Sequence, residues 1–174
     1  MNRIADEMKP APARIRLDDQ LCFALYAATN SITRAYRPLL AEIGLTFPQY
    51  LVMLVLWQNG PRTIGDIAKR LQLPASAISP LADQVERRGF ARRTRASDDR
   101  RVVRLHLTAA GKALERSVAS AQRKVACMTG LGEEEITAMR AALHALADRV
   151  TAEFGTAREA EPAAGDGGLA LKHG

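Results

Sequence analysis

Several features are absent from this chain of 174 residues, and each absence excludes a class of protein. Its two cysteines lie about a hundred residues apart, so no disulfide scaffold is expected. The longest apolar run, residues 50–57, is too short to cross a bilayer. Residues 1–16 contain no apolar segment of the kind that marks a secretory signal. We therefore expect a cytoplasmic protein whose thiols are reduced.

Aromatic residues make up only 5% of the sequence, whereas alanine and leucine are abundant. With 47% hydrophobic residues, this composition predicts a mainly α protein with one core. His106 and His144 are isolated from other side chains that bind metals. No metal and no other cofactor is expected.

The strongest pattern lies in residues 63–108. Thr63 and Asp66 have the spacing of a capping box, which starts a helix. Pro74 cannot continue that helix and disfavours helical backbone at the residue before it. A second amphipathic helix follows and ends at Gly89. Two short helices joined by a tight turn are therefore predicted.

Beyond the second helix the pattern changes to that of a hairpin. Residues 90–94 and 102–107 are expected to be extended, and the polar segment 95–101 suits the tip between them. Helix, turn, helix and hairpin in this order form a winged helix-turn-helix. Such a unit places its second helix in the major groove of DNA and its hairpin against the flanking backbone or minor groove.

The second helix supplies the expected DNA contacts. If Ser76 is its N-cap, Pro80 lies about one turn in and removes little of the hydrogen-bond ladder; otherwise the helix bends at Pro80. The face opposite its apolar residues, together with one neighbouring arginine, is expected to touch bases or phosphates. These side chains are Ser76, Ser79, Gln84, Arg87 and Arg88.

Charge supports the same interpretation. Residues 86–104 contain eight arginines and three acidic residues, a local balance of +5 in a chain whose total is +6. The guanidinium fork suits phosphate and guanine edges, although a solvated basic surface is the alternative for any one arginine. The hairpin contributes Arg95, Arg100 and Arg101 to the expected DNA contacts.

A long helix is expected near the N-terminus, with Asp18 or Asp19 as its cap. One stripe of apolar residues along it is expected to form core: Leu21, Leu25, Ala28, Ile32, Ala35 and Leu39.

Cys22 lies in the first turn of this helix, where the helix dipole favours a thiolate. At 100° per residue, four hydroxyl-bearing side chains point within about 40° of Cys22, and phenols can stabilise a thiolate through hydrogen bonds. They are Tyr26, Thr29, Thr33 and Tyr36. The negative charge of Asp18 and Asp19 opposes a thiolate, and a lone helical cysteine can instead be a small buried hydrophobe.

The remaining helices frame the winged unit. Thr46 and Gln49 form another capping box, and the helix they start should be the most buried, because it is apolar nearly all round. Two amphipathic helices follow Thr108. Together with the first helix they are expected to form a homodimer, which suits a palindromic operator; a helical hairpin packed on its own subunit is the alternative. The first of the two carries an apolar seam, and Cys127 lies off it. The seam residues are Leu114, Val118, Ala121, Val125 and Met128.

The expected organisation has a flexible arm, one domain and a disordered tail. The domain combines a winged helix-turn-helix with dimerisation helices on either side of it. The boundaries are 1–16 for the arm, 17–154 for the domain and 155–174 for the tail, with the winged unit at 46–107 and the dimerisation helices at 17–43 and 108–154.

Residues 99–111, DRRVVRLHLTAAG, resemble the wing signature D-x-R-x-x-x-L-x-L-T-x-x-G of the MarR family of regulators. Residues 21–27, LCFALYA, and 48–54, PQYLVML, are similar to its organic hydroperoxide resistance subgroup, of the type with two cysteines. The resemblance covers about residues 17–150. It implies that Arg101 enters the minor groove and that Asp99 positions the wing.

The resemblance also implies a redox switch. Cys22 matches the peroxide-reactive cysteine, and Tyr26 and Tyr36 match tyrosines around its thiolate. Phe47 stands where the subgroup usually has a third tyrosine, which removes one donor. Cys127 matches the resolving cysteine, which pairs with the reactive cysteine of the other subunit. Oxidation by an organic hydroperoxide would then release the repressor from its operator.

Two other functions compete with this one. A repressor of the same family could respond to a small phenolic or apolar ligand held between the first helix and the winged unit. A thiol peroxidase could use Cys22, but no arginine or histidine lies on the helical row of the cysteine to activate peroxide. We expect a regulator and not an enzyme.

Overall fold

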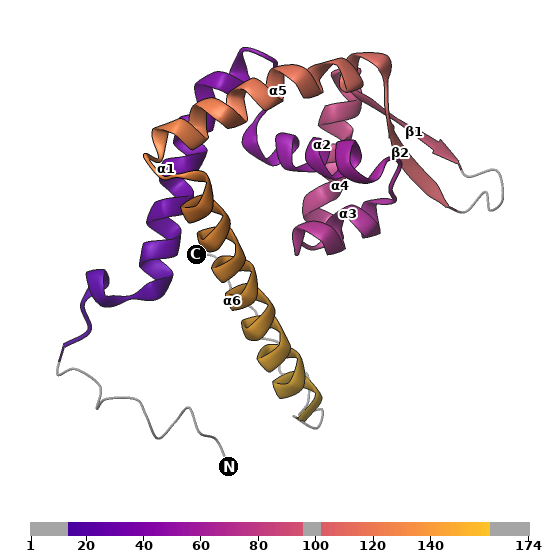
Figure 1. The fold of residues 1–174 in the computed structure, drawn as a ribbon. Helices are drawn as coiled ribbons and strands as arrows, with labels where there is room; N and C mark the ends of the chain where they lie inside the picture. The colour runs from indigo at the N-terminus through magenta and orange to yellow at the C-terminus, as the bar shows by residue number, and fades with distance from the viewer. Residues whose placement is uncertain (1–13, 96–101, 161–174) are drawn as a thin grey trace, which may run out of the picture. The chain divides into compact units, whose positions relative to one another are not determined.

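The computed structural model describes residues 14–95 and 102–160 (Figure 1). A short turn of 3-10 helix, Leu17–Asp19, precedes six α-helices and one antiparallel sheet of two strands. The predicted fold class, mainly α with a hairpin wing, is confirmed. The elements are α1 (Leu21–Ala41), α2 (Phe47–Asn59), α3 (Ile64–Leu71), α4 (Ala75–Arg87), β1 (Ala91–Arg95), β2 (Val103–Leu107), α5 (Ala109–Met128) and α6 (Glu133–Ala160).

None of the helices in the described ranges combines the length and the apolar character needed to cross a membrane. The chain divides into two compact units, with the boundary between Met128 and Thr129. The first unit holds α1 to α5 and the sheet, and the second holds α6.

The first helix of the helix-turn-helix forms as predicted. The Thr63 hydroxyl accepts a hydrogen bond from the Asp66 amide, and the Asp66 carboxylate accepts one from the Thr63 amide, both at 3.1 Å. Hydrogen bonds from the Thr63 side chain and backbone to the Asp66 carboxylate lower the pKa of Asp66. Gln72 ends the helix in the left-handed conformation, with φ of 54°. The capping box is therefore confirmed.

The second helix begins earlier than predicted. Its N-cap is Pro74, whose extended backbone leads directly into α4, so Ser76 lies inside the helix. The prediction of Ser76 as N-cap is wrong, and Pro80 consequently lies in the second turn rather than the first. Gly89, with φ of +74°, turns the chain into the wing as expected.

The wing is a hairpin whose strands start one residue later than predicted. In its register Ala91 pairs with Leu107, and Arg93 pairs with Leu105. Arg62 adds an isolated bridge to Leu105, which joins the α2–α3 loop to the outer side of β2. The predicted tip extends beyond β1 into residues 96–101, which lie outside the described residues.

The core is built around α2, which packs against α1, α3, α4, α5 and β2. The prediction that this helix is the most buried is confirmed. Six of its residues are buried: Gln49, Tyr50, Val52, Met53, Val55 and Leu56. The predicted capping box also forms, since the Gln49 side chain accepts a hydrogen bond from the Thr46 amide at 3.0 Å.

The N-terminal helix differs from its prediction in two ways. Asp18 and Asp19 lie in the 3-10 turn, and Gln20 is the N-cap of α1. Leu40 is the only buried residue of α1 within the described chain. The predicted core stripe is therefore not core: Leu21 and Ile32 are 62% and 42% exposed, and its other members are exposed or half-buried. One chain therefore leaves an apolar surface on α1.

The last two helices also differ from each other. In α5 the middle of the predicted seam is buried against α1 and α2, with Val118 at 2% and Val125 at 4% exposure, whereas Met128 at its end is 66% exposed. In α6, taken by itself, Met139 and Leu143 remain 52% and 44% exposed. This helix continues to Ala160, so the prediction of a disordered tail from residue 155 is wrong for 155–160. The rest of the predicted tail, and residues 1–13 of the predicted arm, lie outside the described residues.

Gly111 is the point where α5 approaches the base of the wing. A Cβ on this residue would lie 1.9 Å from the Phe90 carbonyl oxygen. The Gly111 amide donates to the Thr108 hydroxyl at 3.1 Å, and its carbonyl accepts from the Trp57 indole at 3.0 Å. This close approach leaves no room for a side chain.

Gly111→Ala is expected to lower the free energy of unfolding by about 1–3 kcal/mol, because its Cβ must displace backbone atoms. Alanine ordinarily stabilises a helix relative to glycine, so the expected sign is reversed here. Urea denaturation measures the change.

Gly65→Ala in α3 is the matched control, since its nearest neighbour would be the Thr63 hydroxyl at an ordinary 3.8 Å. This variant should keep or raise stability, by up to about 1 kcal/mol. Equal effects of the two alanines would contradict the close approach at Gly111.

Candidate nucleic-acid interface and cysteine sites

Part of the polar face predicted for α4 is exposed on this chain. Ser76 and Arg87 are exposed, Ser79 is half-buried, and Ile78, Ala82 and Val85 are buried on the opposite side. Ser76, Ser79 and Arg87 therefore stay predictions for contacts with bases or phosphates. Hydroxyl and guanidinium groups on one exposed helix face can read base edges or bind phosphate.

Two of the predicted DNA contacts have partners within the protein. The Gln84 side chain accepts a hydrogen bond of 2.6 Å from buried Gln49, which ties α4 to the start of α2. Arg88 donates to the carbonyl of Gly44 in the α1–α2 loop. These contacts give both side chains a role in holding α4 against α2 and the α1–α2 loop.

The wing residues are only partly described. Arg95 is exposed at the end of β1. Asp99, Arg100 and Arg101 lie outside the described residues. Their expected contacts with DNA stay predictions.

The structure adds an ionic network that the sequence analysis missed. Arg93 of β1 lies 2.6 Å from the Asp83 carboxylate and 2.7 Å from the Glu86 carboxylate, both on α4. The Arg93 amide also donates to Glu86 at 2.7 Å. Burial opposes the charge of Arg93, but the two acids outweigh it and raise the pKa of Arg93. Asp83 and Glu86 are three residues apart and so share one helix face, but this spacing does not identify the cation that they bind.

Cys22 is an exposed free thiol and the second residue of α1. Its position in the first turn is as predicted, although the cap differs. Tyr26, one turn further along, is 65% exposed. Both side chains are therefore accessible on one chain.

Tyr36 lies elsewhere, in an aromatic cluster between α1 and α2. It stacks on Tyr50 with ring centroids 5.4 Å apart, and Phe47 lies 5.5 Å from it. Burial, and then Tyr50, raise the pKa of Tyr36 above that of a free phenol. Tyr50 accepts a hydrogen bond of 2.8 Å from Gln122 of α5. Tyr50 and Gln122 were not predicted, because no local spacing links residues on separate helices.

The distance along α1 limits what Tyr36 can do. Cys22 and Tyr36 are 14 residues apart on one helix, which corresponds to roughly 21 Å at a rise of about 1.5 Å per residue. Tyr36 therefore cannot contact Cys22 of its own chain.

Cys127 is likewise an exposed free thiol, next to the last residue of α5. The prediction that it lies off the buried seam is confirmed. The described residues contain no group of side chains suited to a metal ion.

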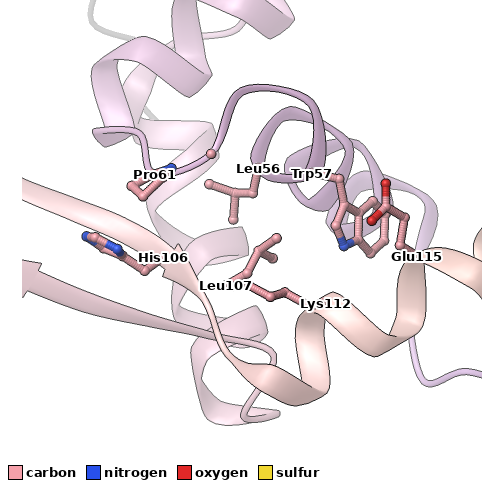
Figure 2. A pocket seen from close by; sticks show the side chains of 8 residues that line it. Leu56, Trp57, Pro61, His106, Leu107, Lys112 and Glu115 are labelled. Atoms are coloured by element: carbon pink, nitrogen blue, oxygen red, sulfur yellow. The ribbon is translucent and has the colours of Figure 1, made fainter.

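A pocket of about 370 Å³ lies at the base of the wing (Figure 2). The end of α2, the end of β2 and the first turns of α5 surround it, so it differs in position from the ligand site predicted beside the first helix. Its lining residues are Leu56, Trp57, Gly60, Pro61, His106, Leu107, Lys112 and Glu115.

Two helices joined by a tight turn, a following hairpin and arginines on the same unit define a winged helix-turn-helix that binds DNA. The model of the MarR family matches residues 45–103. The chain is 40% identical over 140 residues to the HTH-type transcriptional regulator TtmR of Methylorubrum extorquens. The aligned region covers 80% of this chain and 72% of that protein. The chain belongs to the MarR family and is a DNA-binding regulator of transcription.

The names of other similar proteins and structures refer to redox chemistry. The organic hydroperoxide resistance transcriptional regulator of Bacillus subtilis is 30% identical over 132 residues, covering 76% of this chain and 90% of that one. Reduced AbfR bound to DNA matches with a TM-score of 0.64 and 28% identity, over 78% of this chain and 95% of that one. Disulfide-formed AbfR matches with a TM-score of 0.57 and 27% identity, over 80% and 93%. AbfR is a protein of Staphylococcus epidermidis.

Proposed function

We propose that this regulator is a homodimeric repressor that senses organic hydroperoxides through Cys22 and Cys127. The observation that carries the proposal is the position of Cys22, an exposed thiol in the first turn of α1 with an exposed tyrosine one turn away. The names of the Bacillus relative and of the two AbfR structures support the same chemistry.

The reaction has two balanced steps. The sulfur of Cys22 attacks the terminal oxygen of R–OOH, the O–O bond breaks, and the products are Cys22–SOH and R–OH. The thiol of Cys127 in the other subunit then attacks the sulfenic sulfur, and a disulfide and one water are formed. Two sulfurs are oxidised and the hydroperoxide is reduced.

The tyrosines fit this scheme only in a dimer. Tyr26 is close to Cys22 in the same chain, whereas Tyr36 is roughly 21 Å away along the helix axis. If two copies of α1 pack antiparallel about a two-fold axis near Thr29, midway between the two positions, Cys22 meets Tyr36 of the partner subunit. The exposed apolar residues of α1, such as Ile32, provide surface for this pairing.

Disulfide formation would change DNA binding through geometry. The two Cβ atoms of a disulfide must come within about 3.5–4.5 Å of each other, which tolerates little separation between helices. Moving α1 and α5 would shift the recognition helices from the spacing of about 34 Å that two half-sites require. The repressor would then leave its operator.

In the reduced dimer, Ser76, Ser79 and Arg87 would face the major groove. Arg95, Arg100 and Arg101 of the wing would reach the flanking backbone or minor groove, and Asp99 would hold the wing in position.

A repressor released by a small ligand is the second candidate function. The pocket at the base of the wing favours it, since it combines apolar walls with a tryptophan and a few polar side chains. A ligand there would press on the junction between β2 and α5. The apolar surfaces of Leu56, Trp57 and Leu107 suit a phenolic or apolar molecule.

Operator titration before and after one equivalent of cumene hydroperoxide tests the first proposal, with non-reducing electrophoresis of the same samples. Oxidised protein should run as a covalent dimer and lose its operator affinity, and dithiothreitol should restore both. Oxidation that leaves the affinity unchanged would refute the redox switch and turn attention to the pocket.

A further inference from the structure

Arg93 connects the wing to the recognition helix. Its guanidinium contacts Asp83 at 2.6 Å and Glu86 at 2.7 Å, one nitrogen to each acid. Its backbone amide donates to the second oxygen of Glu86, also at 2.7 Å. Both the side chain and the backbone of one strand residue are therefore held by α4.

These three residues are placed where their contacts can fix the orientation of the strand relative to the helix. Asp83 and Glu86 lie almost one turn apart on α4, and Arg93 is the middle residue of β1, opposite Leu105 of β2. Only Arg88, Gly89 and Phe90 separate the helix from the strand. The amides of Gly89 and Phe90 donate to carbonyls at the end of α4, and Thr108 donates to the carbonyls of the same two residues, so hydrogen bonds hold the base of the wing. The contacts of Arg93 lie further along β1 and constrain the strand itself.

The same contacts exclude Arg93 from the DNA-binding arginines. Two carboxylates already occupy its fork, and its side chain is only 30% exposed. A phosphate would have to displace charge-assisted hydrogen bonds to reach it. Removing Arg93 would thus remove a constraint on the wing rather than a contact with DNA.

We propose that Arg93 is a positioning residue that sets the angle between the wing and the recognition helix. At this angle α4 would enter the major groove while the wing would contact the flanking part of the same half-site. The inference rests on the proposed contact between the wing and DNA. Lysine cannot replace this residue fully, because a point charge lacks the planar fork that binds both acids at fixed geometry.

The test compares Arg93→Ala with Arg92→Ala, which removes the same charge from the neighbouring, exposed position on the other side of the strand. Hydroxyl-radical footprinting on the operator reports the wing, and protection of guanine N7 from methylation reports the major groove. Arg93→Ala should lose the flanking protection and roughly tenfold to a hundredfold in affinity, and keep the guanine protection. Arg92→Ala should keep both kinds of protection.

The double variant Asp83→Asn and Glu86→Gln leaves Arg93 in place and removes two negative charges. If charge alone governed binding, this variant would bind DNA more tightly. The proposal predicts the opposite result for the wing, which is loss of the flanking protection as in Arg93→Ala. If Arg93→Ala does not fold, this double variant still tests the proposal.

Two outcomes would overturn the proposal. Flanking protection could survive in both variants, or the double variant could bind more tightly with its footprint intact. Absence of flanking protection in the wild type would instead refute the proposed contact between wing and DNA.

Discussion

Cys22→Ser protein is expected to stay on operator DNA after one equivalent of an organic hydroperoxide, under conditions in which the wild type loses roughly 100-fold in affinity. Serine keeps the size of the side chain but cannot form a sulfenic acid or a disulfide. Before oxidation the two proteins should bind equally, because Cys22 lies on α1 and outside the helix-turn-helix. Fluorescence anisotropy of a labelled operator measures both affinities.

Cys127→Ser is the matched variant, since it removes the other exposed thiol and leaves Cys22 intact. It should form Cys22–SOH, trapped by dimedone and detected by mass, but no covalent dimer. If Cys22→Ser still releases DNA on treatment with hydroperoxide, Cys22 is not the sensor. If the wild type also fails to respond to hydroperoxide, a repressor released by a small ligand becomes the favoured function.

Ile32→Asp is expected to convert the dimer into a monomer and to lower operator affinity by at least roughly 100-fold. Ile32 is 42% exposed in a single chain and is not part of its buried core, so the substitution should lower the stability of that chain little. In an α1–α1 interface the carboxylate would be desolvated without a partner. The affinity falls because two half-sites are no longer bound at once. Sedimentation equilibrium gives the mass.

Ile15→Asp is the control for this prediction. Ile15 is 88% exposed and precedes α1, so the same substitution there should leave both the mass and the affinity unchanged. A dimeric Ile32→Asp protein would show that α1 does not form the interface. The alternative of a helical hairpin on its own subunit would then gain support.

The sequence predicts those parts of the fold that depend on neighbours along the chain. The capping boxes at Thr63 and Thr46, the glycine that ends α4 and the hairpin after it all follow from local spacing, and all are confirmed. The N-caps of α1 and α4 were wrong because an extended residue without a capping side chain, Gln20 or Pro74, starts each helix.

Pairings between elements could not be predicted in the same way. Gln84 is polar and lies opposite the apolar face, which predicts a base contact but gives no indication of its hydrogen bond to Gln49 on another helix. Arg93 looked like one arginine among eight, but two acids on α4 hold it. Such roles depend on which helices meet in space, and a single sequence carries no local signal for that.

Trp57 is the only tryptophan of the chain. Its indole nitrogen donates to the Gly111 carbonyl, and its ring lines the pocket between α2, β2 and α5 (Figure 2). Indole emission responds to hydrogen bonding and to solvent, so this residue is a built-in optical probe of the junction between wing and α5. Stopped-flow fluorescence of unlabelled protein can therefore time the movement of that junction separately from the release of DNA.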